Sequence, residues 1–232
     1  MITIGEYLDW DSCFFGYGVA RIVADENNEK FINDEISRFR QQGCRLIYVF
    51  SRGPLILTGL DAALVDRKRS YKLSSPKYSP VKRPIVPVYD VSDSLYDLGC
   101  QAGVYSRYNV DPRIKHEDFR RLYRLWVDNS VSRQFADYLL AYEMNGRYIG
   151  FVTAKVKGDM LSVGLIATDS RYRGRGIGTA LMQSVINISA ERGLAVEVTT
   201  QSDNTQACQF YEHLGFSIDS QDYVYHVWLE DH

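Results

Sequence analysis

Apolar and polar residues follow two different periods along the second half of the chain. Residues 160–167 form a short, mostly apolar run with β-branched side chains, which predicts a buried strand. Beyond residue 176, apolar residues recur every three or four positions until Gly193, which predicts an amphipathic helix that a glycine ends. Residues 194–200 predict a second strand, and residues 203–216 predict a second helix with Asp203 or Asn204 as its cap. This alternation indicates an α/β fold.

The segment between the first strand and its helix is rich in glycine and arginine. It contains Arg171, Arg173 and Arg175 interleaved with three glycines at 174, 176 and 178. At the start of a helix the free N–H groups and the positive end of the dipole favour a phosphate, and glycine lets the backbone approach it closely. The segment therefore predicts a pyrophosphate site.

Other glycine-rich phosphate loops fit this segment less well. A dinucleotide-binding turn requires Gly-x-Gly-x-x-Gly, whereas the spacing here is Gly174-x-Gly176-x-Gly178. A P-loop requires Gly-Lys-Ser or Gly-Lys-Thr, which this segment lacks. An ordinary exposed turn stays open as the alternative, because glycine and arginine are common at the surface.

A second motif follows at the predicted second helix, where the sequence reads Asn204-x-x-Ala-x-x-x-Tyr-Glu-x-x-Gly-Phe216. Together with the Arg-x-x-Gly-x-Gly loop before it, this motif resembles the GNAT superfamily of N-acetyltransferases over residues 137–228. The resemblance implies a GNAT acyltransferase fold, in which helices flank a mixed central sheet. It also implies acetyl-CoA as co-substrate, with no metal.

The resemblance assigns roles to residues of both motifs. Arg173, Gly174, Gly176 and Gly178 would wrap the pyrophosphate of coenzyme A, the edge of the strand near Leu165 would pair with pantetheine, and Asn204 would bond near the pantetheine arm. The full set of coenzyme-binding residues implied in this way is Leu165, Ile166, Ala167, Arg173, Gly174, Arg175, Gly176, Ile177, Gly178, Thr179, Asn204 and Ala207.

The chemistry implied by the family is direct attack of an amine on the thioester. Tyr211 occupies the position where the family places a phenol near the coenzyme A sulfur, so we expect it to act as general acid. A buried structural phenol is the alternative reading of Tyr211. The strand at 161–168 carries no carboxylate, so the general base stays open between Glu197, Glu212 and a chain of water molecules.

The first half of the chain has its own organisation. A helix predicted at 33–42, a glycine, and strands predicted at 45–50 and 64–73 faintly repeat the order of the C-terminal elements. Four of the six prolines, at 76, 80, 84 and 87, then favour an extended linker. We therefore expect a smaller, partial GNAT-like domain at 1–75, a linker at 76–90 and a GNAT acetyltransferase domain at 91–232.

Short aromatic motifs point to the acceptor. Trp10-Asp-Ser-x-Phe-Phe-Gly16, Ser106-Arg-Tyr108 and Tyr123-x-x-Trp126 resemble the GNAT subgroup that acetylates nucleotide-linked amino sugars, the dTDP-fucosamine acetyltransferases. Aromatic faces can stack on a base or sugar, and a guanidinium can donate two hydrogen bonds to a diphosphate. The predicted acceptor-binding residues are Phe14, Phe15, Arg107 and Tyr108. Alternatively, Phe14 and Phe15 form a hydrophobic plug between domains.

Composition narrows the partners further. The chain has 232 residues, 45% of them hydrophobic, with a formal net charge of −2 and a pI near 6.1, so its charge gives no reason to expect nucleic acid or an anionic membrane as partner. It shows neither an apolar run long enough for a bilayer nor a signal-peptide pattern, and we expect a cytoplasmic protein. Four scattered cysteines indicate neither zinc nor disulfides.

Several alternatives remain open at this stage. The acceptor can instead be a peptide or protein amine, or the chain can be a non-catalytic module that binds acetyl-CoA. The sequence leaves open a homodimer, the identity of the sugar and its nucleotide, and whether the acyl group is acetyl or longer.

Overall fold

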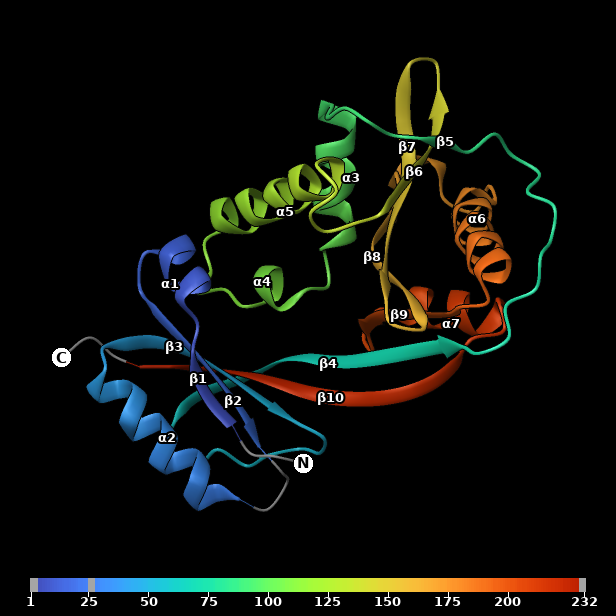
Figure 1. Cartoon of the computed structure of the whole chain (residues 1–232). Coiled ribbons are helices and arrows are strands. Elements are labelled where there is room, and N and C mark those ends of the chain that lie inside the picture. The colour runs from blue at the N-terminus through green and yellow to red at the C-terminus, as the bar shows by residue number, and fades with distance from the viewer. Residues whose placement is uncertain (1–3, 25–27, 230–232) are drawn as a thin grey trace. The chain divides into compact units, whose positions relative to one another are not determined.

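The computed structural model describes residues 4–24 and 28–229. The chain divides into two compact units (Figure 1). Unit 1 comprises Met1–Arg69, Gln201–Asp203 and Ser220–His232, and unit 2 comprises Ser70–Thr200 and Asn204–Asp219. Two long strands, β4 (Asp61–Leu73) and β10 (Ser217–Trp228), contribute residues to both units.

Unit 1 is built around β1, β2 and β3 with parts of β10 and β4, in the order β1, β2, β3, β10, β4. Besides β4 and β10, the elements of unit 1 are β1 (Ile4–Tyr7), α1 (Asp9–Phe15), β2 (Gly18–Ala24), α2 (Glu29–Gln41) and β3 (Cys44–Ser51). Strand β2 runs parallel to β3, whereas β1 and β10 are antiparallel to their partners. The predicted helix and first strand of this half are confirmed as α2 and β3. Helix α2 begins before the predicted start because Asn28 caps it by accepting from Phe31 N at 3.2 Å.

Unit 2 contains an antiparallel meander of three strands that continues into a parallel pair. The strand order is β9, β8, β7, β6, β5, and only the β8–β9 pair within it is parallel. Its elements are β5 (Val86–Pro87), α3 (Asp93–Ala102), α4 (Arg107–Val110), α5 (His116–Val131), β6 (Tyr138–Met144), β7 (Arg147–Lys157), β8 (Met160–Thr168), the short 3₁₀ helix η1 (Ser170–Tyr172), α6 (Ile177–Arg192), β9 (Ala195–Gln201) and α7 (Thr205–His213). The predicted strand at 160–167 is confirmed as β8, and the helix that ends at Gly193 is confirmed as α6.

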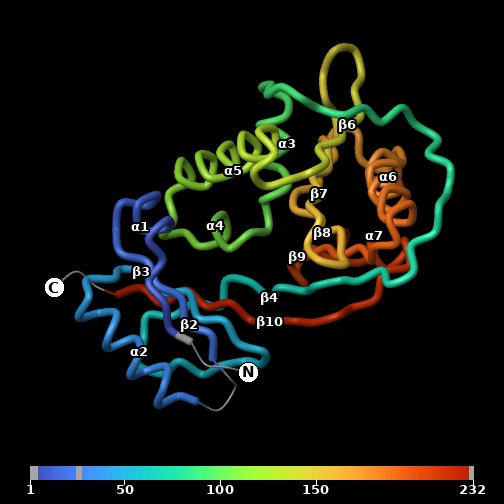
Figure 2. The backbone as a smooth tube through the Cα atoms, in the orientation of Figure 1, coloured from blue at the N-terminus to red at the C-terminus, as the bar shows by residue number. Residues whose placement is uncertain are grey.

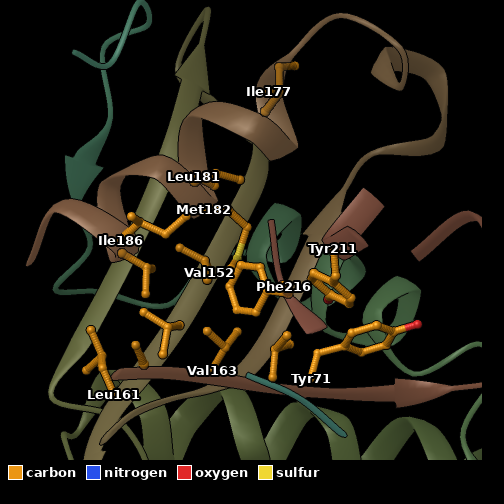
Figure 3. Packing of buried hydrophobic residues seen from close by; sticks show 14 of the residues in the cluster. Tyr71, Val152, Leu161, Val163, Ile177, Leu181, Met182, Ile186, Tyr211 and Phe216 are labelled. Atoms are coloured by element: carbon orange, nitrogen blue, oxygen red, sulfur yellow. The ribbon is translucent and has the colours of Figure 1, made fainter. Parts of the chain in front are cut away.

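The core of unit 2 lies between α6, α7 and the strands. Figure 3 shows Leu181 and Met182 of α6 packed over Val152 and Val163 of the sheet. The clustering of these fully or almost fully buried side chains follows from the hydrophobic effect, at about 25 cal/mol per Å² of apolar surface removed from water. None of the helices within 4–24 and 28–229 is long and apolar enough to cross a membrane.

Helix α6 is buried on more sides than its amphipathic pattern predicts. Besides the predicted apolar positions, Asn187 and Ser189 are buried, with exposed fractions of 8% and 0%. Asn187 is covered because its side chain pairs with the backbone of Ser79, which comes from the segment that the sequence assigns to a linker. The outer face of α6 therefore has a protein neighbour.

The proline-rich segment forms part of unit 2. Its residues Val86 and Pro87 pair with β6 as β5, and Val88 is fully buried and donates its N–H to the carbonyl of Leu139 at 2.9 Å. The division between compact units falls at Arg69 and Ser70, ahead of the predicted linker. Whether 1–75 and 91–232 are separate domains stays a prediction.

Candidate active site

The glycine-rich loop and the start of α6 form the predicted anion site. Gly174 and Gly176 have φ angles of +72° and +75°, which are strained for residues with a side chain. Gly176 is the N-cap of α6, and Ala180 N is the amide that bonds back to its carbonyl, at 3.1 Å. The N–H groups before Ala180 have no helical acceptor, as at every helix N-terminus, so they can bind an anion.

Arg171 and Asp169 form an ion pair directly before the glycine-rich loop, which we call the brace. The Asp169 side chain is 4% exposed, and it accepts hydrogen bonds from Arg171 N at 3.0 Å and from Arg171 Nε and Nη2 at 3.0 and 2.6 Å. The hydrogen bonds from Arg171 lower the pKa of Asp169 to about 2. The charge of Arg171 is thus offset by this carboxylate. Arg173, whose Nε donates to the Thr168 carbonyl at 3.3 Å, and Arg175 are exposed cations of the loop.

Strands β8 and β9 separate where the predicted coenzyme-binding residues begin. Among the residues that the structure describes, the β8–β9 ladder joins Met160–Val163 to Ala195–Val198 and goes no further. The later part of β8, which contains Leu165, Ile166 and Ala167, pairs with β7 on its other side. One edge of β8 therefore offers backbone N–H and C=O groups to an extended ligand.

A bulge in β7 lies opposite this edge. The register between β7 and β8 shifts between Val152 and Ala154, and the Thr153 hydroxyl accepts from Leu165 N at 2.7 Å. The Thr153 side chain thereby satisfies a backbone donor that the shifted ladder would leave unpaired. Nothing in the sequence pattern indicated this contact.

The second motif starts α7. Asn204 caps the helix, since its Oδ1 accepts from Ala207 N at 3.2 Å. Such a cap contributes about 1 kcal/mol to helix stability. The cap predicted from the sequence is thus confirmed for Asn204, and its contact with the pantetheine arm stays a prediction.

Tyr211 lies in the core of unit 2. It is 3% exposed, and its ring centroid is 5.7 Å from that of Tyr71 and 6.0 Å from that of Phe216 (Figure 3). Burial raises the pKa of the Tyr211 hydroxyl well above its ordinary value, and Cys208 and Tyr71 raise it further. The phenol is therefore protonated throughout the neutral pH range.

Tyr71 is a neighbour of the predicted acid that the sequence did not reveal. It is fully buried on β4, and its hydroxyl donates to Oε1 of Glu212 at 2.8 Å. The alternating pattern of residues 64–73 predicts a strand and is confirmed by β4, but alternation carries no information about which helix the strand meets. Glu212 is exposed and Glu197 is half-buried on β9, so both candidates for the base keep access to water.

The predicted acceptor residues belong to different units. In unit 1, Phe14 and Phe15 of α1 join a cluster of rings, with centroid separations of 5.3 Å for Trp10–Phe14, 4.9 Å for Phe14–Phe15 and 5.7 Å for Phe15–Tyr17. Both phenylalanines are half-buried. Their contact with an acceptor stays a prediction.

In unit 2, Arg107 and Tyr108 form α4. The Arg107 guanidinium lies 4.5 Å from the centroid of the Tyr108 ring, and its Nη2 donates to the Tyr108 hydroxyl. Tyr108 is 7% exposed and packs edge-on against Trp126 at 6.1 Å. A shared acceptor site formed by α1 and α4 stays a prediction.

Over the described residues, no group of three or more His, Cys, Asp or Glu side chains could hold a metal ion. The four cysteines are free thiols, and burial raises the pKa of Cys44 and Cys100.

Three sequences similar to this chain are informative. It is 24% identical over 195 residues to the spore coat polysaccharide biosynthesis protein SpsD of Bacillus subtilis (strain 168), covering 78% of this chain and 66% of SpsD. It is 32% identical over 145 residues to the L-2,4-diaminobutyric acid acetyltransferase of Nocardia farcinica (strain IFM 10152), covering 57% of this chain and 72% of that protein. It is 26% identical over 230 residues to the dTDP-fucosamine acetyltransferase of Escherichia coli O6:H1 (strain CFT073), covering 97% of this chain and 96% of that protein.

The fold has matches among solved structures as well. A GCN5-related N-acetyltransferase from Sphaerobacter thermophilus has a TM-score of 0.58 and 13% identity, covering 97% of this chain and 76% of that one. Residues 102–216 match the Acetyltransferase (GNAT) family, and the match contains both the glycine loop and the Asn204–Phe216 motif. With the split between β8 and β9 and the glycine loop at the start of α6, these matches show that the chain belongs to the acetyltransferase (GNAT) family of acetyl-CoA-dependent N-acetyltransferases.

Proposed function

We propose that the protein transfers an acetyl group from acetyl-CoA to the amino group of a nucleotide-activated amino sugar, of the dTDP-4-amino-4,6-dideoxyhexose type. One observation supports the acceptor class: the similarity to dTDP-fucosamine acetyltransferase extends over 97% of this chain and 96% of that protein. The diaminobutyric acid relative is more identical but matches only 57% of this chain. The full-length match therefore includes the segments that carry the predicted acceptor residues.

The donor site is supported by the geometry of unit 2. We assign the pyrophosphate of coenzyme A to the N–H groups at the start of α6, with Arg173 and Arg175 as counter-charges. The pantetheine arm would lie along the edge of β8 at Leu165–Ala167, where its amides can pair with the backbone as an added strand does. Asn204 and Ala207, at the start of α7, complete the proposed site.

The reaction needs no enzyme nucleophile. The neutral amine nitrogen forms a bond to the thioester carbon, the resulting tetrahedral oxyanion collapses, and the carbon–sulfur bond breaks. The nitrogen loses a proton to Glu197, Glu212 or water, and the sulfur leaves as a thiolate. Transfer is balanced because the proton lost at nitrogen is matched by one that the departed thiolate takes up from water, while Tyr211 hydrogen-bonds the sulfur as its charge develops.

Tyr211 is the proposed donor to the sulfur. Its raised pKa keeps the hydroxyl protonated, which a donor requires, but makes it a weaker acid than an ordinary thiol, whose pKa is about 8.5. Complete proton transfer to a free thiolate would therefore be uphill. The phenol acts most effectively by a hydrogen bond that strengthens as charge develops on the sulfur.

On the acceptor side, we assign aromatic stacking to Phe14 and Phe15, and contact with the acceptor diphosphate to Arg107 beside Tyr108. We expect the reaction to take place in the cytoplasm.

The test is acetylation by the purified protein of a panel of amines in the presence of acetyl-CoA. The panel contains a dTDP-4-amino-4,6-dideoxyhexose, L-2,4-diaminobutyric acid and a peptide with a free N-terminus. Release of the coenzyme A thiol and the mass of the product are measured. We expect the nucleotide sugar to give the highest kcat/KM. Faster acetylation of the peptide or the diamine would replace the proposed acceptor, and binding of acetyl-CoA without turnover on any amine would leave a non-catalytic module.

A further inference from the structure

The proline-rich segment at residues 74–90, which we call the strap, is fixed to α6 near its start. Ser79 N donates to Asn187 Oδ1 at 3.0 Å, and Asn187 Nδ2 donates to the Ser79 carbonyl at 2.9 Å. Gln183 Nε2 also donates to Asn187 Oδ1, at 2.9 Å. The two-way pairing makes the backbone at Ser79 a fixed point beside α6. Figures 1 and 2 show the chain between β4 and β5 passing alongside α6.

The strap is fixed again near its end. Val86 and Pro87 pair with Ala141 and Leu140 of β6, and the buried Val88 donates to the Leu139 carbonyl. Between the two anchors, prolines at 80 and 84 each hold φ near −65°. The six residues at 80–85 therefore have little freedom, and the side chain of Arg83 projects from a defined backbone.

Arg83 contacts the glycine-rich loop directly. Its Nη2 donates to the backbone carbonyl of Arg175, and its Nη1 donates to the Tyr142 hydroxyl at 3.4 Å. The guanidinium lies 5.6 Å from the centroid of the Tyr142 ring. A Cβ at Gly176, the N-cap of α6, would lie 3.9 Å from Arg83 Nε.

This contact controls the direction of a backbone amide in the anion site. In a trans peptide the C=O and N–H groups point in opposite directions, and the described residues contain no cis peptide. By holding the carbonyl of Arg175, Arg83 makes the N–H of Gly176 point in the opposite direction, within the same peptide plane. The strap thus limits rotation of that peptide, which Gly176, with its positive φ and no side chain, would otherwise permit.

The charges around the loop point to an anionic ligand. Within the described part of the chain, no carboxylate forms an ion pair with Arg83, and this guanidinium lies beside Arg175 and the positive end of the α6 dipole. Cations at a helix N-terminus repel its dipole. A bound diphosphate removes that repulsion, so Arg83 favours the loaded state through its charge as well as through its hydrogen bond.

We propose that Arg83, held by the strap, is a positioning residue for the diphosphate of coenzyme A: it orients the Arg175–Gly176 peptide and adds a cation beside it. This inference rests on the proposed donor site. It assigns to residues 74–90 a role in donor binding, in place of a mere connection between domains.

The experiment compares two ligands by calorimetric titration. Coenzyme A carries the diphosphate, and pantetheine contains the arm without it. The proteins are wild type, Arg83→Ala, Arg83→Lys and Lys82→Ala, the last being a matched control that removes an exposed cation from the neighbouring strap position. We expect Arg83→Ala to weaken coenzyme A about tenfold, as for loss of a charged hydrogen bond, with unchanged pantetheine binding. Arg83→Lys should recover part of the lost coenzyme A affinity, because lysine keeps the charge but lacks the paired N–H donors of a guanidinium. Lys82→Ala should bind coenzyme A as wild type does.

Each other outcome has a separate meaning. Coenzyme A affinity within about twofold of wild type in folded Arg83→Ala, with no loss in Arg83→Lys, overturns the role of Arg83 and leaves the donor site standing. Equal weakening of coenzyme A and pantetheine also overturns it, because a general loosening of unit 2 affects both ligands. Failure of the wild-type protein to bind coenzyme A removes the donor site itself, and the role of Arg83 with it.

Discussion

The donor and acceptor sides of this protein are encoded in different ways. Most of the predicted donor residues fall in one stretch, Leu165–Thr179, and the other two, Asn204 and Ala207, follow in the same compact unit. The predicted acceptor residues are divided between α1 in unit 1 and α4 in unit 2. Phosphates are bound largely by backbone N–H groups at a helix start, which a local motif reveals. A sugar or base is recognised by side chains, whose grouping depends on the fold.

The largest expected effect separates chemistry from binding on the donor side. Tyr211→Phe keeps the ring in the core and deletes the hydroxyl, so kcat should fall about 100- to 1,000-fold, as for the loss of one donor to a developing negative charge, while the affinity for acetyl-CoA changes little. Steady-state assays of thiol release, at saturating acetyl-CoA and nucleotide amino sugar, measure kcat. Calorimetric titration measures the affinity for acetyl-CoA.

A matched control is Tyr71→Phe, which deletes a hydroxyl from the neighbouring ring 5.7 Å away. A rate for Tyr211→Phe within about threefold of wild type, less than 1 kcal/mol of barrier, would reduce Tyr211 to a packing residue. Equal losses in both variants would point to the hydrogen-bonded pair of Tyr71 and Glu212 in place of Tyr211.

The next effect tests whether the donor side depends on its backbone. Gly176→Val places a branched side chain where φ is +75°, so it obstructs the amides at the start of α6. We expect coenzyme A affinity to fall about tenfold or more, that is by at least 1.4 kcal/mol. Gly193→Val provides the control, because Gly193 has a similar φ of +65° at the opposite end of the same helix. Equal coenzyme A affinities in folded Gly176→Val and wild type would remove the loop from the site.

A smaller effect is expected on the acceptor side. Phe15→Ala or Arg107→Ala should raise KM for the nucleotide amino sugar several-fold, on the order of 1 kcal/mol, and leave KM for acetyl-CoA nearly unchanged. Initial rates with each substrate varied in turn provide both constants, and Arg120→Ala on the exposed face of α5 controls for loss of charge. If both constants rise together, or if Phe15→Ala unfolds, Phe14 and Phe15 are a hydrophobic plug.

The smallest expected effect concerns the brace, the ion pair of Asp169 and Arg171 that precedes the glycine-rich loop. Arg171 lowers the pKa of Asp169 to about 2, so the unfolded chain binds this proton more tightly than the folded protein. The brace therefore contributes stability above about pH 4, which is lost as the pH falls towards 2. Because the Arg171 side chain is 64% exposed, we expect only about 1 kcal/mol. Denaturant unfolding of wild type and Asp169→Asn between pH 2 and 7 should show free energies of unfolding that converge at low pH; a constant difference would contradict the brace.

Local patterns in the sequence predicted much of unit 2. The apolar run at 160–167 became β8, the three- and four-residue spacing became α6, and Asn204 became the cap of α7. Each of these depends on residues a few positions apart, because helix and strand periods, caps and glycine conformations are local properties. The glycine loop could be located for the same reason.

Tertiary structure alone decided which separate segments meet. The amphipathic pattern of α6 predicts an exposed outer face, yet the strap covers it at Asn187. Tyr71 lies beside Tyr211, and Arg83 reaches the carbonyl of Arg175, across 140 and 92 positions of sequence respectively. Nothing in the period of either segment records such a contact, because it results from the packing of complete elements into one core. The sequence by itself therefore determined the family and the place of the glycine-rich loop, while the side chains that contact the loop and surround the proposed acid were set by the fold.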